Sequence, residues 1–422
     1  MVDRLPVVID CGTGYTKMGY GGNDRPQWTI PTYIATNADK AKGVKGIGVS
    51  KGSMADMDFF IGDEAFRLRD SERYLCSSPI EKGQIQSWDD MERYWHHCMY
   101  KYLRCDPEEH NVLLTEPPMN SPDNREQTAE IMFETFNVAG LHIGVQAVLA
   151  LYGHLYGLDP SMAASMPALT GTVLDAGDGV THIVPVADGF VIGSCIKEIP
   201  LAGKDVTQFI VDMLRDRQEP IPPECRLEAA TTIKEKHAYI AKDLVKEFKK
   251  YDENSSKIKI LEGNKPRSQE KWSIEIGHER FLAPEIFFNP EIFSERVSTP
   301  LPNLVDQCIQ SSPIDYRRKL YENVVLSGGS TMFERFPERL QRDIKGIVDM
   351  RLQRAFDKSG SKPSDISVKV SSSSKQRYAV WFGGSVFSMG PLFKHVLHTK
   401  AQYEEIGPNI ARSNALSAAL GA

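Results

Sequence analysis

The sequence lacks most of the features that mark secreted, membrane-embedded or nucleic-acid-binding proteins. Its seven cysteines are scattered, odd in number and without a C-x-x-C pair, which indicates reduced thiols rather than disulfides or a zinc site. No apolar run approaches the roughly 20 residues of a membrane span, and the chain does not open on a signal peptide. The net charge is −6, without the clustered Lys and Arg of a nucleic-acid surface. We therefore expect a cytoplasmic protein with no nucleic-acid partner and no membrane insertion.

What the chain does have is length and an internal repeat. Its 422 residues, 41% of them hydrophobic, favour two or more domains. A strand ending in Asp, a Gly-rich turn and a second strand occur twice, 165 residues apart. The first copy spans residues 5–20 with Asp10 and the second spans 172–186 with Asp175. The repeat predicts two similar α/β halves.

These turns suggest a polyphosphate site. Gly-rich turns let backbone N–H groups approach phosphate oxygens. Asp10 and Asp175 are suited to hydrated Mg²⁺, Lys17 to neutralising phosphate charge, and Thr13 to donating a hydroxyl hydrogen. A single turn of this kind is more often a plain hairpin, but two Asp-ended turns with later Gly-Gly turns favour the phosphate site. Neither a Walker P-loop nor a Rossmann fingerprint is present.

Two later segments carry a Gly-Gly pair. Residues 324–333 are expected to form a strand and a turn at Gly328-Gly329, followed by a helix at 337–347. The helix N-terminus could help that turn to hold a nucleoside or α-phosphate. Residues 378–385 are interpreted as another strand that leads through Gly383-Gly384 into a helix.

Two side chains are candidates for assisting hydrolysis. Gln146 could orient a water for attack on a γ-phosphate, and His182 could relay its proton. The residues alone favour these roles no more than a helix cap for Gln146 and a hydrogen-bonded strand histidine for His182.

Together these segments resemble the actin superfamily, in order from about residue 5 to about residue 412. The similarity is carried by residues 10–17, 113–118, 131–136, 146–149, 175–182, 234–236, 326–332 and 380–384. Further segments, including 58–62, 191–197, 280–288, 376–384 and 398–408, are similar to the actin-related proteins rather than to actin itself.

The resemblance implies an α/β, actin-like two-lobed fold built from duplicated ribonuclease-H-like halves, with ATP in the central cleft. The outer lobe would comprise 1–153 plus 379–422, with a subdomain 2 insertion at about 32–78. The inner lobe would comprise 154–378, with a subdomain 4 insertion at about 202–294.

The resemblance also implies the ligands and their residues. The cofactors would be ATP or ADP with Mg²⁺, for which Ca²⁺ could substitute in vitro. Phosphate contacts would come from Gly12, Thr13, Gly14, Lys17, Gly177, Asp178 and Gly179. Contacts to metal-bound water would come from Asp10, Gln146 and Asp175. Nucleoside contacts would come from Gly203, Lys234, Glu235, Gly329, Met332, Phe333 and Arg377.

The implied role is structural, with at most slow regulatory ATP hydrolysis. The chain would pair with actin-related protein 2 and five further subunits in the actin-nucleating and branching complex, and template a daughter filament on the side of a mother filament. Its other partners would be actin filaments and nucleation-promoting factors with an amphipathic helix, placing it in the actin cytoskeleton. Those helices would bind a groove near Tyr152, Phe382, Val386 and Phe387, which could equally be ordinary core.

Two alternatives and two departures complete the comparison. Self-polymerising actin is disfavoured by extra length at 37–58, 262–272 and 357–367. A sugar kinase is disfavoured because no segment supplies a clear carboxylate base, and a chaperone because no residues are left for a separate peptide-binding domain. Ala176 stands where the family usually has Ser, which removes a hydroxyl near the γ-phosphate. The tail at 413–422 does not follow the family pattern.

Overall fold

The computed structural model describes residues 4–37, 59–69, 71, 73–158, 169–253, 258–265, 270–361 and 363–413. The segment of extra length at 37–58 and the divergent tail at 413–422 lie outside these residues apart from Asn37 and Ser413. The chain divides into two compact units: Met1–Leu169, Asp188–Val191 and Tyr378–Ala422 form unit 1, and Thr170–Ala187 and Ile192–Arg377 form unit 2. The first boundary differs from the predicted one at 153/154, which falls within helix α5 (Gln146–Leu158). No helix within the described ranges is long and apolar enough to cross a bilayer.

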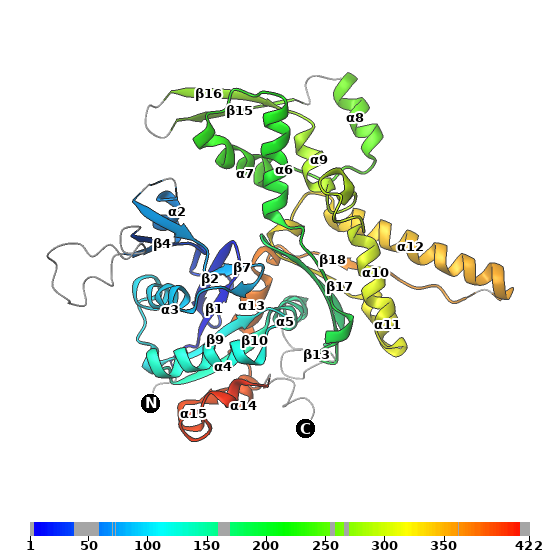
Figure 1. Ribbon diagram of the computed structural model, residues 1–422. Coiled ribbons are helices and arrows are strands. Elements are labelled where there is room, and N and C mark those ends of the chain that lie inside the picture. The colour runs from blue at the N-terminus through cyan, green and yellow to red at the C-terminus, as the bar shows by residue number, and fades with distance from the viewer. Residues whose placement is uncertain are drawn as a thin grey trace. The chain divides into compact units, whose positions relative to one another are not determined.

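A six-stranded sheet in the order β19-β10-β9-β1-β2-β3 forms the centre of unit 1 (Figure 1). The predicted hairpin is confirmed, since β1 and β2 pair antiparallel. β1 pairs with β9 and β9 with β10 in parallel, which aligns the carboxyl ends of these three strands at one edge. The strands are Val7–Cys11 (β1), Tyr15–Tyr20 (β2), Trp28–Pro31 (β3), Asn111–Glu116 (β9), Gly140–Val145 (β10) and His398–Thr399 (β19).

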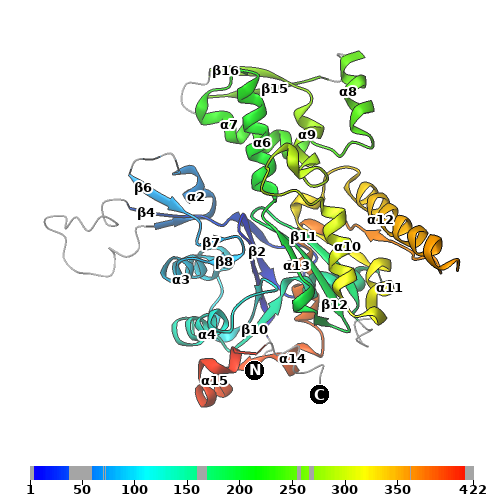
Figure 2. The same cartoon turned by 45° about the vertical axis from the view of Figure 1, so that its right-hand side comes forward.

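Helices cover both faces of this sheet. On one face, α3 (Trp88–His96) and α4 (Pro122–Glu130) run on into π-helical turns, His97–Leu103 and Ile131–Thr135, and pack on alternate strand residues such as Ile9. Figure 2 shows α3 and α4 together on that side. On the other face lie α5 (Gln146–Leu158) and α13 (Ala379–Phe387), which pack on each other.

At α13 the structure differs from the sequence-based prediction. Residues 378–385 were expected to begin as a strand, but the helix runs unbroken through Gly383-Gly384. The reason is packing: a Cβ on Gly383 would lie 2.5 Å from the carbonyl carbon of Leu149, so glycine permits backbone contact between α13 and α5. The indole of Trp381 is fully buried and donates to the carbonyl of Val8 at 3.0 Å, which joins α13 to β1.

The remaining elements of unit 1 are short. They are Ile34–Asn37 (β4), Phe59–Ile61 (β5), Gly62–Arg67 (α2), Tyr74–Ser77 (β6), Ile80–Glu81 (β7), Gln84–Ile85 (β8), Phe190–Val191 (β13), Phe393–Val396 (α14) and Lys400–Ile406 (α15).

Unit 2 contains the second copy of the repeat. Strands β11 and β12 pair antiparallel, as β1 and β2 do, and β11 pairs in parallel with β17, as β1 does with β9. The two Asp-ended hairpins are therefore confirmed as equivalent in topology. The strands that unit 2 contributes to this sheet are Gly171–Ala176 (β11), Thr181–Ala187 (β12), Lys197–Ile199 (β14), Val324–Ser327 (β17) and Val370–Ser371 (β18).

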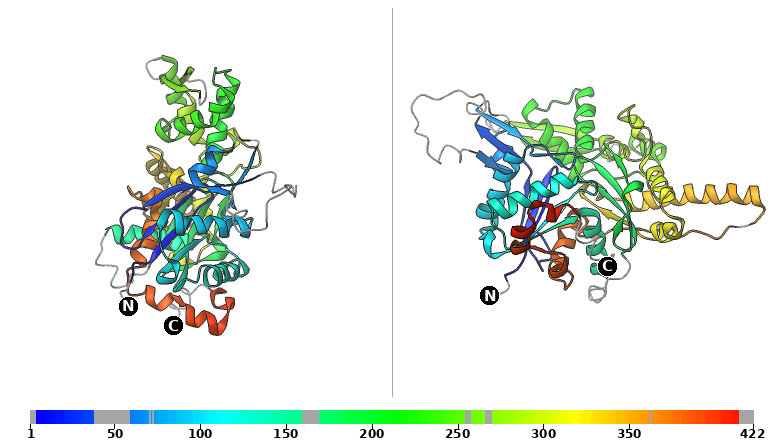
Figure 3. Two further views of the ribbon diagram at one scale, coloured as in Figure 1. Left: turned by 90° about the vertical axis from the view of Figure 1, so that its left-hand side faces the viewer. Right: turned by 60° about the horizontal axis from the view of Figure 1, so that its bottom comes forward.

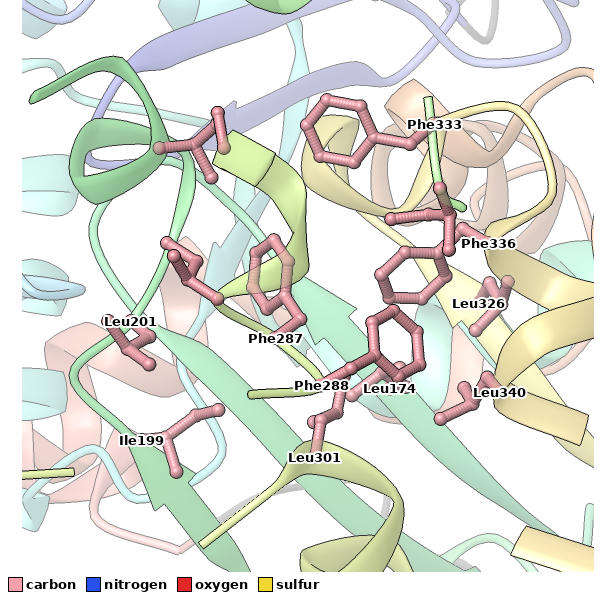
Figure 4. Close-up of a cluster of buried hydrophobic side chains, with 14 of the residues drawn as sticks. Leu174, Ile199, Leu201, Phe287, Phe288, Leu301, Leu326, Phe333, Phe336 and Leu340 are labelled. Carbon is pink, nitrogen blue, oxygen red and sulfur yellow. The ribbon is translucent and has the colours of Figure 1, made fainter. Parts of the chain in front are cut away.

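The core of unit 2 is rich in aromatic residues. Phe287, Phe288 and Phe336 pack together beside the sheet residues Leu174 and Leu326 (Figure 4). The helices and the outlying hairpin are Gly203–Asp216 (α6), Arg226–Lys236 (α7), Leu244–Glu253 (α8), Lys259–Asn264 (β15), Lys271–Ile276 (β16), Glu279–Glu285 (α9), Leu301–Ser311 (α10), Ile314–Glu322 (α11) and Phe336–Ser359 (α12).

Helix α12 is longer than the predicted 337–347. Its last two turns are exposed and extend beyond the rest of their unit, as the yellow-orange helix of Figure 3 shows. The helix ends where Gly360 adopts φ +67° and donates its N–H to the carbonyl of Phe356 at 2.8 Å.

Candidate functional site

The first candidate half-site is the β1–β2 turn in unit 1. The N–H of Gly12 donates to the carbonyl of Tyr15 at 3.2 Å and closes the turn. Thr32 holds it from the side, because its hydroxyl donates to the Gly12 carbonyl at 2.7 Å and its N–H donates to the Gly14 carbonyl at 3.0 Å. Within the described residues, the N–H groups of Thr13 and Gly14 make no hydrogen bond. The turn therefore presents two free amide donors.

The hydroxyl of Thr13 has a partner on a second turn. The N–H of Gly83, in the turn between β7 and β8, donates to the Thr13 hydroxyl oxygen at 3.0 Å. This bond uses the oxygen as an acceptor and leaves the hydroxyl hydrogen of Thr13 available as a donor, the role predicted for it.

Asp10 stands at the carboxyl end of β1 and is almost completely buried. One carboxylate oxygen, Oδ1, accepts from the hydroxyl of Thr115 at 2.7 Å and, at a long 3.4 Å, from the side-chain amide of Gln146. The other, Oδ2, lies 3.1 Å from the ammonium of Lys17. Three residues predicted from the sequence, Asp10, Lys17 and Gln146, are thus brought together, and Thr115 joins them.

The second half-site is the β11–β12 turn in unit 2. The N–H of Gly177 donates to the carbonyl of Val180 at 3.3 Å. Helix α6 begins against the turn, since the N–H groups of Gly203 and Lys204 donate to the carbonyls of Gly177 and Asp178 at 3.0 and 2.9 Å. In this part of the described chain the N–H groups of Asp178 and Gly179 are free of hydrogen bonds. The first turn's pair of free amides thus has a counterpart here.

Lys234 is the cation of the second half-site. Its ammonium donates to the Gly203 carbonyl at 3.0 Å and lies 3.8 Å from the carboxylate of Asp178. Burial lowers its pKa, and the neighbouring carboxylate opposes that shift. A largely buried ammonium whose ion pair with Asp178 is long, at 3.8 Å, is suited to an anionic ligand.

The Gly328-Gly329 turn completes this region. Gly328 has φ +90°, and a Cβ there would lie 2.6 Å from the carbonyl carbon of Ala176, so this position requires glycine. Gly329 has open space around it. Ser330 follows, and its hydroxyl donates to the Gly177 carbonyl at 2.7 Å.

The other predicted residues of unit 2 lie in different environments. Glu235, Met332 and Arg377 are exposed, whereas Phe333 is buried at the edge of the aromatic core (Figure 4). Asp175 and His182 are paired in register across β11 and β12. The imidazole of His182 is largely buried and lies 3.6 Å from the carboxylate of Glu198 on β14.

The predicted activator groove consists mainly of packed side chains. Tyr152, Phe382 and Phe387 are buried, and Val386 is half-buried. The rings of Tyr152 and Phe387 meet edge to face at 5.5 Å between centroids. This packing has the character of the ordinary core that the sequence left open as the alternative.

Comparison with known proteins accounts for the repeat and the turns. A sequence model of the family described as Actin matches residues 3–272 and 231–415. The chain is 53% identical to actin-related protein 3 of Dictyostelium discoideum, covering 97% of this chain and 96% of that protein. It is 54% identical to actin-related protein 3 of Acanthamoeba castellanii, with 98% of both chains covered, and 52% identical to that of Oryza sativa subsp. indica, with 97% of both. The chain belongs to the actin family.

Membership of the actin family gives the duplicated α/β halves their fold, the actin fold, and makes nucleotide binding the general property to expect of the two half-sites. The relatives that match nearly its full length are described as actin-related protein 3, so the chain is of the actin-related type.

The residues of each half-site suit the phosphate groups of a nucleotide. Each turn offers two free amide donors and a nearby ammonium, Lys17 or Lys234, to phosphate oxygens. Among the described residues no group of three or more His, Cys, Asp or Glu could hold a metal by itself. Separate carboxylates suit Mg²⁺, which keeps several of its waters and takes further ligands from phosphate.

Sequence reasoning missed Thr115 and Ser330. Thr115 lies near the end of a buried strand next to β1, and its separation of 105 residues from Asp10 in the sequence hides their contact. Ser330 directly follows the Gly-Gly pair, a position that could have drawn attention to it.

Proposed function

We propose that this chain is the ATP-binding, actin-like subunit of an actin-nucleating and branching complex. It would pair with actin-related protein 2 and five further subunits and template a daughter filament on the side of a mother filament. The observation that carries this proposal is the 52–54% identity to actin-related protein 3 of two amoebae and a plant over nearly the full length of each chain. Its further partners would be actin filaments and activators with an amphipathic helix, in the cytoplasm.

The proposed ligand is ATP with Mg²⁺. The turns at Gly12–Gly14 and Gly177–Gly179 bind phosphate oxygens through their free amides, with Lys17 and Lys234 supplying positive charge. Asp10, Gln146 and Asp175 hold the waters of the metal. The nucleotide serves as a ligand that favours one arrangement of the actin-like subunit by differential affinity.

Any hydrolysis is slow and regulatory in this proposal. Gln146 would orient the attacking water and His182 would relay its proton. Ala176 provides no hydroxyl, so the γ-phosphate has one donor fewer than the usual Ser would supply.

The decisive experiment is to purify the tagged chain from its own cells and to measure the native mass and the subunit list. Six different partners at one copy each, with Mg²⁺-dependent ATP binding and actin nucleation only when activator is added, would support the proposal. A self-polymer would favour conventional actin. A free monomer that transfers phosphate to a small molecule would favour a kinase, and either result would overturn the proposal.

A further inference from the structure

Three side chains from three elements of unit 1 form a closed hydrogen-bonded group. Asp10 comes from β1, Thr115 from β9, and Gln146 is the first residue of α5, directly after β10. The parallel pairing of β1 with β9 and of β9 with β10 brings these positions to one edge of the sheet. The hydroxyl of Thr115 is the common member, because it donates to Asp10 Oδ1 at 2.7 Å and accepts from Gln146 Nε2 at 3.5 Å.

This group fixes the orientation of the Gln146 amide. Its nitrogen faces two acceptors, the Thr115 hydroxyl oxygen and the Asp10 carboxylate, and a flipped amide would place its oxygen against both. The amide oxygen Oε1 therefore points away from the group, and within the described residues it accepts no hydrogen bond. An outward amide oxygen can accept a hydrogen from water.

The same group determines which oxygen of Asp10 is presented. Oδ1 is occupied by Thr115 and Gln146, whereas among the described residues the sole partner of Oδ2 is the ammonium of Lys17 at 3.1 Å. A carboxylate held in this way offers a single oxygen, in a fixed direction, to a metal-bound water.

We propose that Thr115 is a positioning residue that sets which oxygens of Asp10 and Gln146 face the waters of a nucleotide-bound divalent cation. The inference rests on the proposed function and deepens it, since it assigns the orientation of the metal-water contacts to a residue that touches neither nucleotide nor metal. Outer partners of this kind typically change metal affinity 10- to 100-fold when they are removed.

The test is a pair of ATP titrations on the full chain in its native assembly, one with excess Mg²⁺ and one with chelator. The ratio of the two Kd values measures how much the cation adds to ATP binding. Thr115→Val removes the hydroxyl from a side chain of similar shape, and we expect the ratio to fall about 10-fold or more while the Kd without metal stays within about twofold. Thr115→Ser keeps the hydroxyl and is expected to restore the ratio.

Thr128→Val is the matched control. Thr128 is a buried threonine of the same unit, and its hydroxyl donates to the carbonyl of Asn124 within α4 at 2.8 Å. It is expected to leave both Kd values unchanged. Should Thr115→Val fail to fold, Thr115→Ala against Thr115→Ser provides the same comparison.

An unchanged ratio in the hydroxyl-free variant would overturn the inference. So would an equal loss of affinity with and without metal, because a merely structural hydroxyl would produce that result. Failure of the unaltered chain to bind ATP would instead overturn the proposed function, and the two failures are thus told apart in one experiment.

Discussion

Replacing Gly383 by alanine should strongly destabilise unit 1. A Cβ on Gly383 would lie 2.5 Å from the carbonyl carbon of Leu149, where ordinary van der Waals contact begins at 3.4 Å. Helices α13 and α5 would therefore have to separate by at least 0.9 Å (3.4 minus 2.5). The obstacle is backbone, so no change of side-chain rotamer can relieve it.

The expected cost follows from two opposing effects. Alanine favours a helix over glycine by about 1 kcal/mol. Overpacking of this kind costs about 1–3 kcal/mol and more when backbone must move, and the parted helices also lose dispersion contacts along their length. Because the backbone itself must move, we take the gross cost as about 4 kcal/mol, so the net loss is about 3 kcal/mol, which for a unit of this size lowers Tm by about 6–12 °C.

Thermal unfolding, monitored by circular dichroism, measures this loss of stability, and Gly157→Ala is the control. Gly157 lies in α5, the helix that carries Leu149, and a Cβ there would meet no atom of the described residues within 4 Å. That variant should melt at the same temperature as the unaltered chain or up to about 3 °C higher. If Gly383→Ala melted within about 2 °C of the unaltered chain, the packing argument for α13 would be wrong.

Three further predictions concern other residues. Burial lowers the pKa of His142 to about 4 from an ordinary 6.5, so the unfolded chain binds more protons between these values. The contribution of His142 to stability should be constant above pH 6.5 and be lost towards pH 4, and His142→Gln should remove this part of the pH dependence in melting curves. Arg351→Met leaves the carboxylate of Asp306 without its two guanidinium hydrogen bonds at 2.7 and 2.8 Å, and should cost about 2 kcal/mol in thermal unfolding, an amount reduced by partial exposure. Lys17→Met removes the ammonium beside Asp10 and should weaken ATP binding about 10-fold or more in titrations, with little change in Tm.

Local pattern was enough to predict the parts of the fold that depend on near neighbours. The two Asp-ended hairpins and the strand before Gly328-Gly329 follow from strand runs and turn residues. The prediction of a strand at the start of 378–385 was wrong, because an apolar run with a Gly-Gly pair has the same sequence pattern whether the glycines form a turn or allow a neighbouring helix to pack closely. Gly328 does the first and Gly383 does the second.

The candidate site was predictable only as separate residues. The types of Asp10, Lys17 and Gln146 suggested their chemistry, but their contact depends on strand order, which places β9 between β1 and β10. Thr115 could not be selected from the sequence, because a threonine near the end of a buried strand is common and its role comes from what lies beside it. The burial of Phe333, Tyr152 and Phe387 is likewise a property of packing between distant segments.

The order in which the chain leaves the ribosome differs from the order in which its units can be completed. Residues from the last segment are part of the core of unit 1, since Trp381 binds the backbone of β1 and Tyr403 stacks on Phe133. Unit 2 is contained between residues 170 and 377, so its sheet and aromatic core are fully synthesised earlier. During translation, unit 2 should become resistant to protease before α13 has been synthesised, when unit 1 still lacks the helix that packs on β1. A chaperone that shields exposed strands would accordingly stay longest on the N-terminal segment, which is synthesised first.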